Sequence, residues 1–339
     1  MAAEIAVRLC VLTAIRVSSL IGRHRRTDQL KPSILIVNGP GLGDLSVDGA
    51  KSDRGLGLTM IRDASRALCE QFGIQLDFRH TEDLDKVSQW LARESQEFDG
   101  VIVNPVGYSR ATTVPIENYR AAIQTIAHLN KPVIEVHINN IFHHGAESTQ
   151  PLREDGGDMG FICGFGLNSY LAAIRAIGLR LQVHHRDHNR RINKVDKVFI
   201  LNGPNLNLLG RREPEIYGRL TLEDLARRCA EVGVQRGLDV EFRQTNHEGE
   251  LVDWIQEAID VAKGIIVNAA AYTHTSVAIH DALRANPRPK IELHISNPHL
   301  REAFRQFSYV SPVVDGIVAG LGTSGYALSL QLMADLIDS

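Results

Sequence analysis

The sequence predicts an α/β protein of two tandem, doubly wound domains, each with a five-stranded parallel sheet that carries helices on both faces. Three observations lead to this fold class. Short runs of β-branched and other apolar residues alternate with helical patterns. Blocks of the first half recur in the same order in the second half. The length of 339 residues suits two domains, and the apolar fraction of 44% and charged fraction of 23% are typical of globular proteins.

The repeat is visible without gaps over most of its length. Four pairs of identical residues keep a spacing of 164 positions: Asn38 and Asn202, Phe78 and Phe242, Trp90 and Trp254, and Asn104 and Asn268. The spacing falls to 157 at His137 and His294, so the first copy carries about seven extra residues between 118 and 132. We therefore expect an extension over 1–33, a first domain over 34–182, a polar linker over 183–196 and a second domain over 197–339.

The second copy contains each element of this fold in order. Strands are predicted over 197–203, 238–245, 264–269, 290–296 and 316–322, and helices over 221–237, 251–262, 276–285, 300–307 and 324–338. Apolar strands that alternate with helices imply right-handed crossovers and a parallel sheet that is buried on both faces. Five strands in about 143 residues fit a flavodoxin-like domain. We expect the first copy to share this plan, because its blocks recur in the same order.

Polar residues gather where the strands of the second copy end. Asn202 and Asn205 follow the first strand, Asn268 ends the third, and His294 and Ser296 end the fourth. Ligands of open α/β sheets bind beyond the carboxyl ends of the strands. The middle of a buried parallel strand has no use for such groups, so the sequence predicts a ligand site at this edge.

Composition argues against several classes of protein. Lys and Arg total 37 and Asp and Glu total 40, so a net charge of −3 gives no reason to expect nucleic acid. No uncharged apolar run of about 18 residues occurs, so no membrane span is expected. The four cysteines are scattered, which favours free thiols in a reducing, cytoplasmic compartment: Cys10, Cys69, Cys163 and Cys229.

The extension over 1–33 differs from the rest of the chain. Its first 26 residues hold five arginines, a single acid in Glu4, and apolar residues at near-helical spacing. This pattern is compatible with an organelle-targeting segment or with an appended surface helix, and the sequence leaves both open.

Three segments of the second copy carry a family resemblance. They are NGPNLNLLGRREPEIYG at 202–218, NAAAYTHTS at 268–276 and ELHISNPHLREAFR at 292–305. Together they resemble type II 3-dehydroquinate dehydratase, a hydro-lyase, and the resemblance covers the whole second copy. It implies anti elimination of water from 3-dehydroquinate through an enolate, giving 3-dehydroshikimate, without metal or cofactor. It also implies a homo-oligomer built from trimers.

The resemblance assigns the base to Tyr217 on a loop that is long enough to act as a lid. A free tyrosine has a pKa near 10, so about one in a thousand is ionised at pH 7. A nearby guanidinium lowers that pKa by favouring the anion. Arg212 matches the essential arginine of the family's lid, and Arg211 is expected to assist.

The remaining roles also follow from the resemblance. His294 matches the acid that protonates the leaving hydroxyl, and Glu292, on the same strand face, is expected to hold its ring. Asn205 matches the asparagine that holds a water against the enolate. The substrate's hydroxyls and carboxylate are assigned to Asn268, His274, Arg305, the backbone of Ile295 and Ser296, and Asp281, which the family uses across a subunit boundary. Arg301, expected one helical turn before Arg305, is either a second cation or a solvated charge.

The first copy departs from this pattern. Asp53 stands where the second copy has Tyr217, and Gly41 stands where it has Asn205; Asp48 and Arg110 replace Arg212 and His274. Glu135 and His137 do match, and Glu117 aligns with Asp281. We therefore expect a degenerate copy that lacks the base and serves as a structural neighbour or binds a related polyol acid. Glu117 is expected to complete the working site in place of a subunit.

The leading hypothesis is thus a 3-dehydroquinate dehydratase whose second copy does the chemistry, in aromatic amino acid biosynthesis or in quinate breakdown. Two alternatives stay open. One is a non-catalytic sensor of quinate- or shikimate-like acids, and the other is an enzyme of the same fold for a different hydroxy acid. The presence of both a base and an acid favours an enzyme over a sensor.

Overall fold

The computed structural model describes residues 31–42, 57–105, 131–143, 158–183, 195–210 and 220–339. Within it, Ser33–Ser339 forms one compact unit. The predicted α/β class with a mostly parallel sheet is confirmed. The extension up to residue 30, with Cys10, lies outside the described residues, as do most of the linker and positions 48, 53, 110 and 117.

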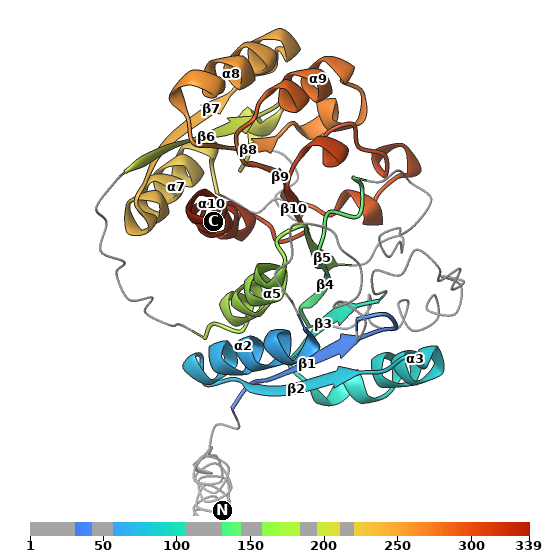
Figure 1. Cartoon of the computed structure of the whole chain (residues 1–339). Helices are drawn as coiled ribbons and strands as arrows, with labels where there is room; N and C mark the ends of the chain where they lie inside the picture. Colours follow the sequence, from blue (N-terminus) through green and yellow to red (C-terminus); the bar gives the residue numbers. More distant parts are fainter. Residues whose placement is uncertain (1–30, 43–56, 106–130, 144–157, 184–194, 211–219) are drawn as a thin grey trace, which may run out of the picture. The chain divides into compact units, whose positions relative to one another are not determined.

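The N-terminal half contains both strands and helices in its described segments (Figure 1). They are β1 Ser33–Asn38, α2 Leu58–Gln71, β2 Gln75–His80, α3 Leu84–Ala92, β3 Gly100–Asn104, β4 Val133–His137, β5 Met159–Cys163 and α5 Leu167–Arg180. The strands β3, β4 and β5 are buried throughout, because helices cover both faces of a parallel sheet. The side chain of Asp83 starts α3 by accepting from the backbone N–H groups of Asp85 and Lys86.

In the C-terminal half the predicted strands and most of the predicted helices are found. Its elements are β6 Asp196–Asn202, α7 Leu222–Arg236, β7 Leu238–Gln244, α8 Glu248–Val261, β8 Gly264–Asn268, α9 Val277–Ala285, β9 Lys290–His294, β10 Gly316–Ala319 and α10 Ser324–Asp338. Thr221 and Asp224 form a capping box that begins α7. Gly237, in the left-handed conformation with φ of 76°, ends it.

The described strands form one ten-stranded sheet in the order β2-β1-β3-β4-β5-β10-β9-β8-β6-β7. Within each half the order is second, first, third, fourth and fifth strand, and these pairings are parallel. The halves join where β5 pairs with β10 in antiparallel fashion, with Ile162 opposite Val318. The sequence does not predict this junction, since strand periodicity does not say which edges meet.

The helices cover the two faces of this sheet. On one face α2, α5, α10 and α7 follow one another, and each packs against the next (Figure 1). Beneath them a single buried cluster contains side chains of both halves, including Ile177 of α5 and Tyr326 of α10. On the other face α3 covers the N-terminal strands, while α8 and α9 cover the C-terminal ones. The halves therefore share one hydrophobic core on the first face.

The predicted helix over 300–307 is wrong. Two short 3-10 turns take its place, η4 Pro298–Leu300 and η5 Ala303–Arg305. Asn297 starts the first turn by accepting from the backbone N–H of His299, and Arg301 then adopts an extended backbone that interrupts any continuous helix. The Gln306 side chain instead donates to the carbonyls of His299 and Arg301. Arg301 is consequently not one helical turn before Arg305.

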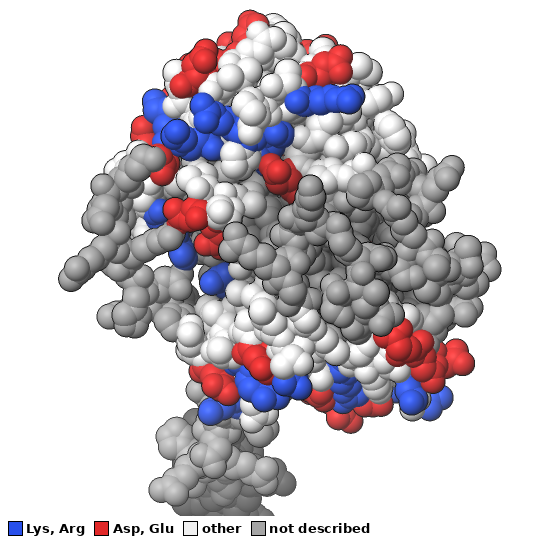
Figure 2. Space-filling view, in the orientation of Figure 1, with Lys and Arg blue, Asp and Glu red and all other residues white. Residues whose placement is uncertain are grey.

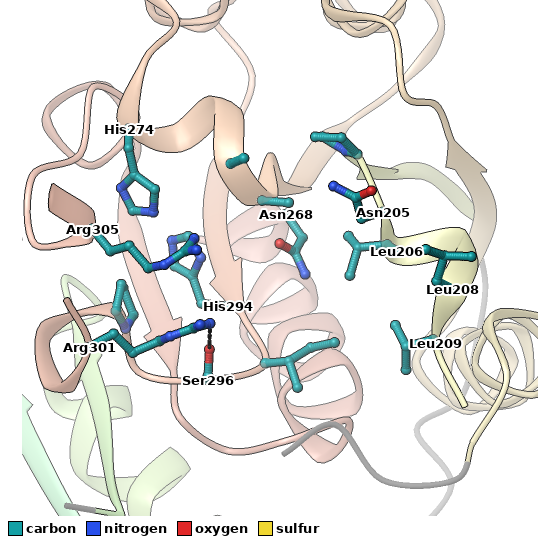
Figure 3. A pocket seen from close by; sticks show the side chains of 15 residues that line it. Asn205, Leu206, Leu208, Leu209, Asn268, His274, His294, Ser296, Arg301 and Arg305 are labelled. Atoms are coloured by element: carbon teal, nitrogen blue, oxygen red, sulfur yellow. Dashed lines mark hydrogen bonds between the residues drawn. The ribbon is translucent and has the colours of Figure 1, made fainter. Parts of the chain in front are cut away.

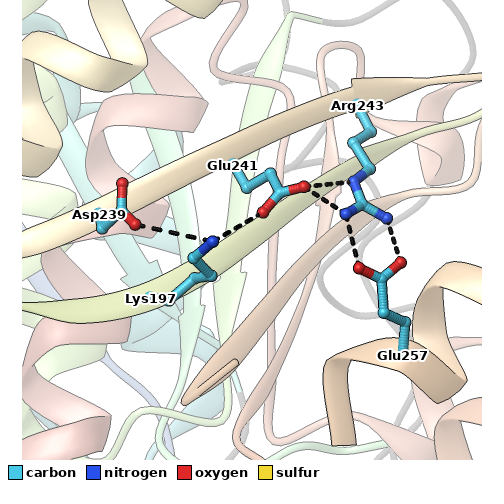
Figure 4. A network of polar contacts seen from close by, with 5 residues as sticks. All are labelled: Lys197, Asp239, Glu241, Arg243 and Glu257. Atoms are coloured by element: carbon cyan, nitrogen blue, oxygen red, sulfur yellow. Dashed lines mark hydrogen bonds and ion pairs between the residues drawn. The ribbon is translucent and has the colours of Figure 1, made fainter. Parts of the chain in front are cut away.

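Both halves hold one arginine at the outer edge of the sheet in the same way. Figure 4 shows Arg243 between Glu241 and Glu257, and Lys197 Nζ lies 3.1 Å from Glu241 Oε2. Arg243 also lies 4.4 Å from the ring centroid of Phe199. In the N-terminal half the equivalent arginine has the same kinds of partner: Arg79 pairs with Asp77 and Glu94 and lies over Trp90. The two copies thus share both the residue types and the contacts that these residues make.

The visible surface matches the balanced charge of the sequence. In Figure 2 the described Lys and Arg side chains stand near Asp and Glu instead of forming one large patch of a single sign. Within the described segments, no helix is both long and apolar enough to cross a membrane. The described cysteines are buried free thiols: Cys69, Cys163 and Cys229.

Candidate active site

A pocket of about 250 Å³ opens at the carboxyl ends of β6, β8 and β9. Eight of the predicted site residues line it: Asn205, Asn268, His274, His294, Ile295, Ser296, Arg301 and Arg305. Figure 3 shows two different walls, with Asn205 and leucines on one side and the histidines and arginines on the other. The sequence therefore predicted the position of the pocket and most of its polar lining.

The end of β6 positions Asn205. Gly203 has no room for a side chain, because a Cβ there would overlap the carbonyl group of Ala269. Asn205 itself adopts the left-handed conformation with φ of 67°, which asparagine tolerates better than most residues. Its backbone N–H donates to Asn246 Oδ1 at 2.9 Å. This tight turn leaves the Asn205 side chain exposed on the rim of the pocket.

A buried histidine–carboxylate pair lies at the end of β9. His294 Nε2 donates to Glu292 Oε1 at 2.8 Å, and Glu292 is fully buried. The side chains of Ser308 and Ser311 also donate to this carboxylate. Burial raises the pKa of Glu292, but the hydrogen bond and charge of His294 and the two hydroxyls outweigh it, so the pKa lies below its usual value. Glu292 therefore holds His294 as the sequence predicted, and Nδ1 is the ring nitrogen left for a ligand.

The opposite wall suits an anion with hydroxyl groups. Arg301 Nη1 lies 3.5 Å from Ser296 Oγ, and Arg305 Nε donates to Glu302 Oε2 at 2.9 Å. His274 Nδ1 donates to the carbonyl oxygen of Phe307 at 2.7 Å. Burial lowers the pKa of His274, and the nearby charges of His294 and Arg305 lower it further. A neutral His274 with its proton on Nδ1 presents Nε2 as a hydrogen-bond acceptor.

A tyrosine of α10 holds the side chain of Asn268. Its Nδ2 donates to the Tyr326 hydroxyl at 3.0 Å, and that hydroxyl donates to Asn202 Oδ1 at 2.7 Å. Burial raises the pKa of Tyr326 above its usual value, so the phenol stays neutral and can donate its proton in a hydrogen bond. The N-terminal half repeats this arrangement with Tyr170 between Asn38 and Asn104. The repeated asparagines were a signal for this support, whereas the tyrosine between them was not predicted.

Some predicted residues are not brought to the pocket. Asp281 lies exposed on α9 and is not part of the lining. Tyr217, Arg211 and Arg212 lie outside the described residues. The apolar wall was not predicted either, although the run NLNLLG was a signal for it: Leu206, Leu208 and Leu209. No signal pointed to Ser308 and Ser311, because their contact with Glu292 depends on loop geometry.

This arrangement favours proton transfer to a small, hydroxylated anion. Two guanidinium groups and a hydroxyl offer bonds to a carboxylate. A histidine backed by a buried carboxylate supplies a proton donor, and the neutral imidazole of His274 and the amide of Asn268 suit hydroxyl groups. Leucines line the other side of the pocket, where they can contact the apolar carbons of a ring.

Comparison with known proteins gives one family for both halves. The model of the family described as "Dehydroquinase class II" matches residues 32–178 and 196–334. A 3-dehydroquinate dehydratase of Mesorhizobium japonicum is 57% identical over 138 residues, which is 40% of this chain and 96% of that protein. One from Cereibacter sphaeroides is 58% identical over 139 residues, which is 41% of this chain and 95% of that protein. Among solved structures, the type II dehydroquinase from Propionibacterium acnes has 48% sequence identity to this chain and a TM-score of 0.41. The match covers 42% of this chain and 98% of that one.

Proposed function

Since the chain belongs to the class II dehydroquinase family, we propose that its C-terminal half, residues 197–339, catalyses the dehydration of 3-dehydroquinate to 3-dehydroshikimate. The observation that carries this proposal is the pair of Glu292 and His294 in a pocket lined by Arg301 and Arg305. The pocket combines a proton donor with groups for a carboxylate, which dehydration of a hydroxylated ring acid requires.

The reaction is an elimination from a β-hydroxy ketone. A base removes a proton from the carbon beside the ketone, and the electron pair of that bond gives an enolate. When the enolate collapses, its electrons form the new carbon–carbon double bond and expel the hydroxyl group. His294 Nδ1 gives this hydroxyl a proton, so that it leaves as water. The negative charge of Glu292 stabilises the imidazolium before the transfer.

The other groups bind and orient the ring. Arg305, Ser296 and the backbone at Ile295 hold the carboxylate, with Arg301 beside them. His274 accepts a hydrogen bond from a substrate hydroxyl, and Asn268 contacts another. Asn205 holds a water against the enolate oxygen. By resemblance, Tyr217 is the base, and Arg212 with Arg211 lowers its pKa.

We further propose that the N-terminal half, residues 34–182, is a degenerate copy in a tandem pair of flavodoxin-like domains. It keeps the pair of His137 and Glu135, whose Nε2 and Oε1 are 2.6 Å apart. Gly41, however, takes the place of Asn205, and its backbone N–H donates to the acidic Glu82 where Asn205 donates to Asn246. A carboxylate at that rim disfavours an anionic substrate. Assembly into a homo-oligomer stays a prediction, and the exposed position of Asp281 leaves it available to a second copy.

The test follows the near-ultraviolet absorbance of the conjugated product when the purified protein is mixed with 3-dehydroquinate. We expect turnover in the parent protein and its loss in Tyr217→Phe. Turnover that survives this change would assign the base to another residue. Binding of the substrate without turnover in the parent protein would favour a sensor of such acids over an enzyme.

A further inference from the structure

Two equivalent asparagines reach across the junction between the halves. Asn140 follows β4 and Asn297 follows β9, 157 positions apart. Asn140 Nδ2 donates to the carbonyl oxygens of Ser311 and Val314, both at 2.8 Å, and Asn297 Nδ2 donates to that of Met159 at 2.9 Å. Both side chains are buried, and each Oδ1 accepts from the backbone N–H two residues later at 3.0 Å. Each half thus uses an equivalent buried asparagine to bond to the backbone of the other half.

The first of these contacts leads to the proposed acid. Asn140 fixes the backbone at Ser311, and the hydroxyl of Ser311 donates to Glu292. Glu292 in turn accepts from His294 at 2.8 Å. Asn140 therefore holds the 3-10 turn Ser311–Val313 at its first residue and just after its last one. The side chain of Ser311 meanwhile holds the carboxylate of Glu292. His143 adds a further contact, with Nε2 donating to the carbonyl oxygen of Val314 at 2.7 Å.

The second contact leads to the substrate-binding wall. Asn297 lies between Ser296 and Pro298, which both line the pocket. Its bond to Met159 ties this segment to β5 of the N-terminal half. The contact is close, since a Cβ at Gly320 would lie 2.6 Å from the carbonyl oxygen of Met159 and 2.9 Å from Cβ of Asn297. Met159 and Asn297 therefore both pack closely against Gly320.

We propose that the N-terminal half is a built-in positioning partner of the pocket, acting through Asn140 on His294 and through Asn297 on the carboxylate-binding segment. This inference rests on the proposed dehydratase activity. Both asparagines are positioning residues, because neither lines the pocket. Misplacement of a catalytic group by about 1 Å costs about 100-fold in rate, so loosening either contact affects turnover. A copy that has lost the base still contributes to catalysis in this way.

The main experiment compares Asn140→Ala with Asn286→Ala in the full chain. Asn286 is a matched control, because it is buried, its Nδ2 donates to the carbonyl oxygen of Ile255 at 2.8 Å, and its Oδ1 accepts from Arg288 at 2.9 Å. It is not part of the pocket lining. We expect both variants to lower the melting temperature. Only Asn140→Ala is expected to lower kcat, by about 2- to 30-fold, with KM near that of the parent protein.

Two further variants locate the effect. Asn297→Ala is expected to raise KM more than it lowers kcat, because it loosens the segment that binds the carboxylate. Ser311→Ala is expected to lower kcat as Asn140→Ala does, and the double variant to lower it by less than the product of the two effects. If Asn140→Ala does not fold, His143→Ala replaces it, since this exposed residue contacts the same turn. It is expected to lower kcat by about twofold.

The outcomes separate this inference from the proposed function. A parent protein without dehydratase turnover overturns both. An active parent protein in which Asn140→Ala and Asn286→Ala have equal kcat, or in which His143→Ala has the parent kcat where it replaces Asn140→Ala, overturns the positioning role alone. Multiplicative effects of Asn140→Ala and Ser311→Ala would show that Asn140 does not act through Ser311.

Discussion

The rings of Phe142 and His299 stack on one another with centroids 5.7 Å apart and planes inclined by 14°. These residues occupy equivalent positions of the two copies, 157 apart in sequence. Equivalent side chains meet in this way where two copies are related by an approximate two-fold axis. The reciprocal contacts of Asn140 and Asn297 and the antiparallel pairing of β5 with β10 follow the same relation.

The repeat provides an internal control for the proposed acid. We expect Glu292→Gln to lower kcat by about 100-fold, because the amide cannot support an imidazolium by charge. Glu135→Gln changes the equivalent buried pair in the N-terminal half and is expected to leave kcat unchanged. Steady-state kinetics of both variants, with melting temperatures measured in parallel, test this. An equal fall in kcat would mean that the pair acts through the stability of the sheet.

A second matched pair tests the support of Asn268. Tyr326→Phe leaves the buried amides of Asn202 and Asn268 without the hydroxyl between them, at a cost of about 1–3 kcal/mol in the free energy of unfolding. Tyr170→Phe makes the same change between Asn38 and Asn104 and is expected to cost about as much. Only Tyr326→Phe is expected to raise KM. Urea unfolding and steady-state kinetics measure the two effects separately, and a KM change in Tyr170→Phe would contradict the assignment.

The lowered pKa of His274 predicts that its ring is mostly neutral at pH 6.5 in the folded protein. The unfolded chain then binds more protons than the folded chain, so this residue adds stability that is present above pH 6.5 and is lost as the pH falls through the folded-state pKa. Nuclear magnetic resonance measures the midpoint, with His274→Gln to assign the signal. A midpoint above 6.5 would contradict the lowered pKa of His274.

The turn before Asn205 makes a steric prediction. A Cβ in Gly203→Ala would meet the backbone of Ala269, which must move, and we expect a loss of about 1–3 kcal/mol in the free energy of unfolding together with a lower kcat. At Gly249 on α8 an added Cβ would have no atom within 4 Å, so Gly249→Ala is expected to be neutral or stabilising by up to about 1 kcal/mol. Unchanged activity in Gly203→Ala would separate this turn from catalysis.

The sequence predicted those features that depend on chain order and periodicity. The repeat and the alternation of strands and helices predicted the parallel sheet, and polar residues at strand ends predicted a pocket that contains Asn268 and His294. The segment 300–307 was predicted as a helix, although the side-chain cap of Asn297 and the extended backbone at Arg301 prevent it. The contacts of Ser308 and Ser311 with Glu292 depend on loop conformation, which spacing does not encode.

The pairing of β5 with β10 also gives a structural role to the N-terminal copy, which we propose lacks a catalytic base. Both strands consist of buried residues, and each would be the outermost strand of its own half-sheet. Without the neighbouring half, β10 would present a row of unpaired amides and carbonyls on an apolar edge, which is a template for aggregation. The N-terminal half therefore covers the apolar edge of β10, a role that needs no catalytic residues of its own.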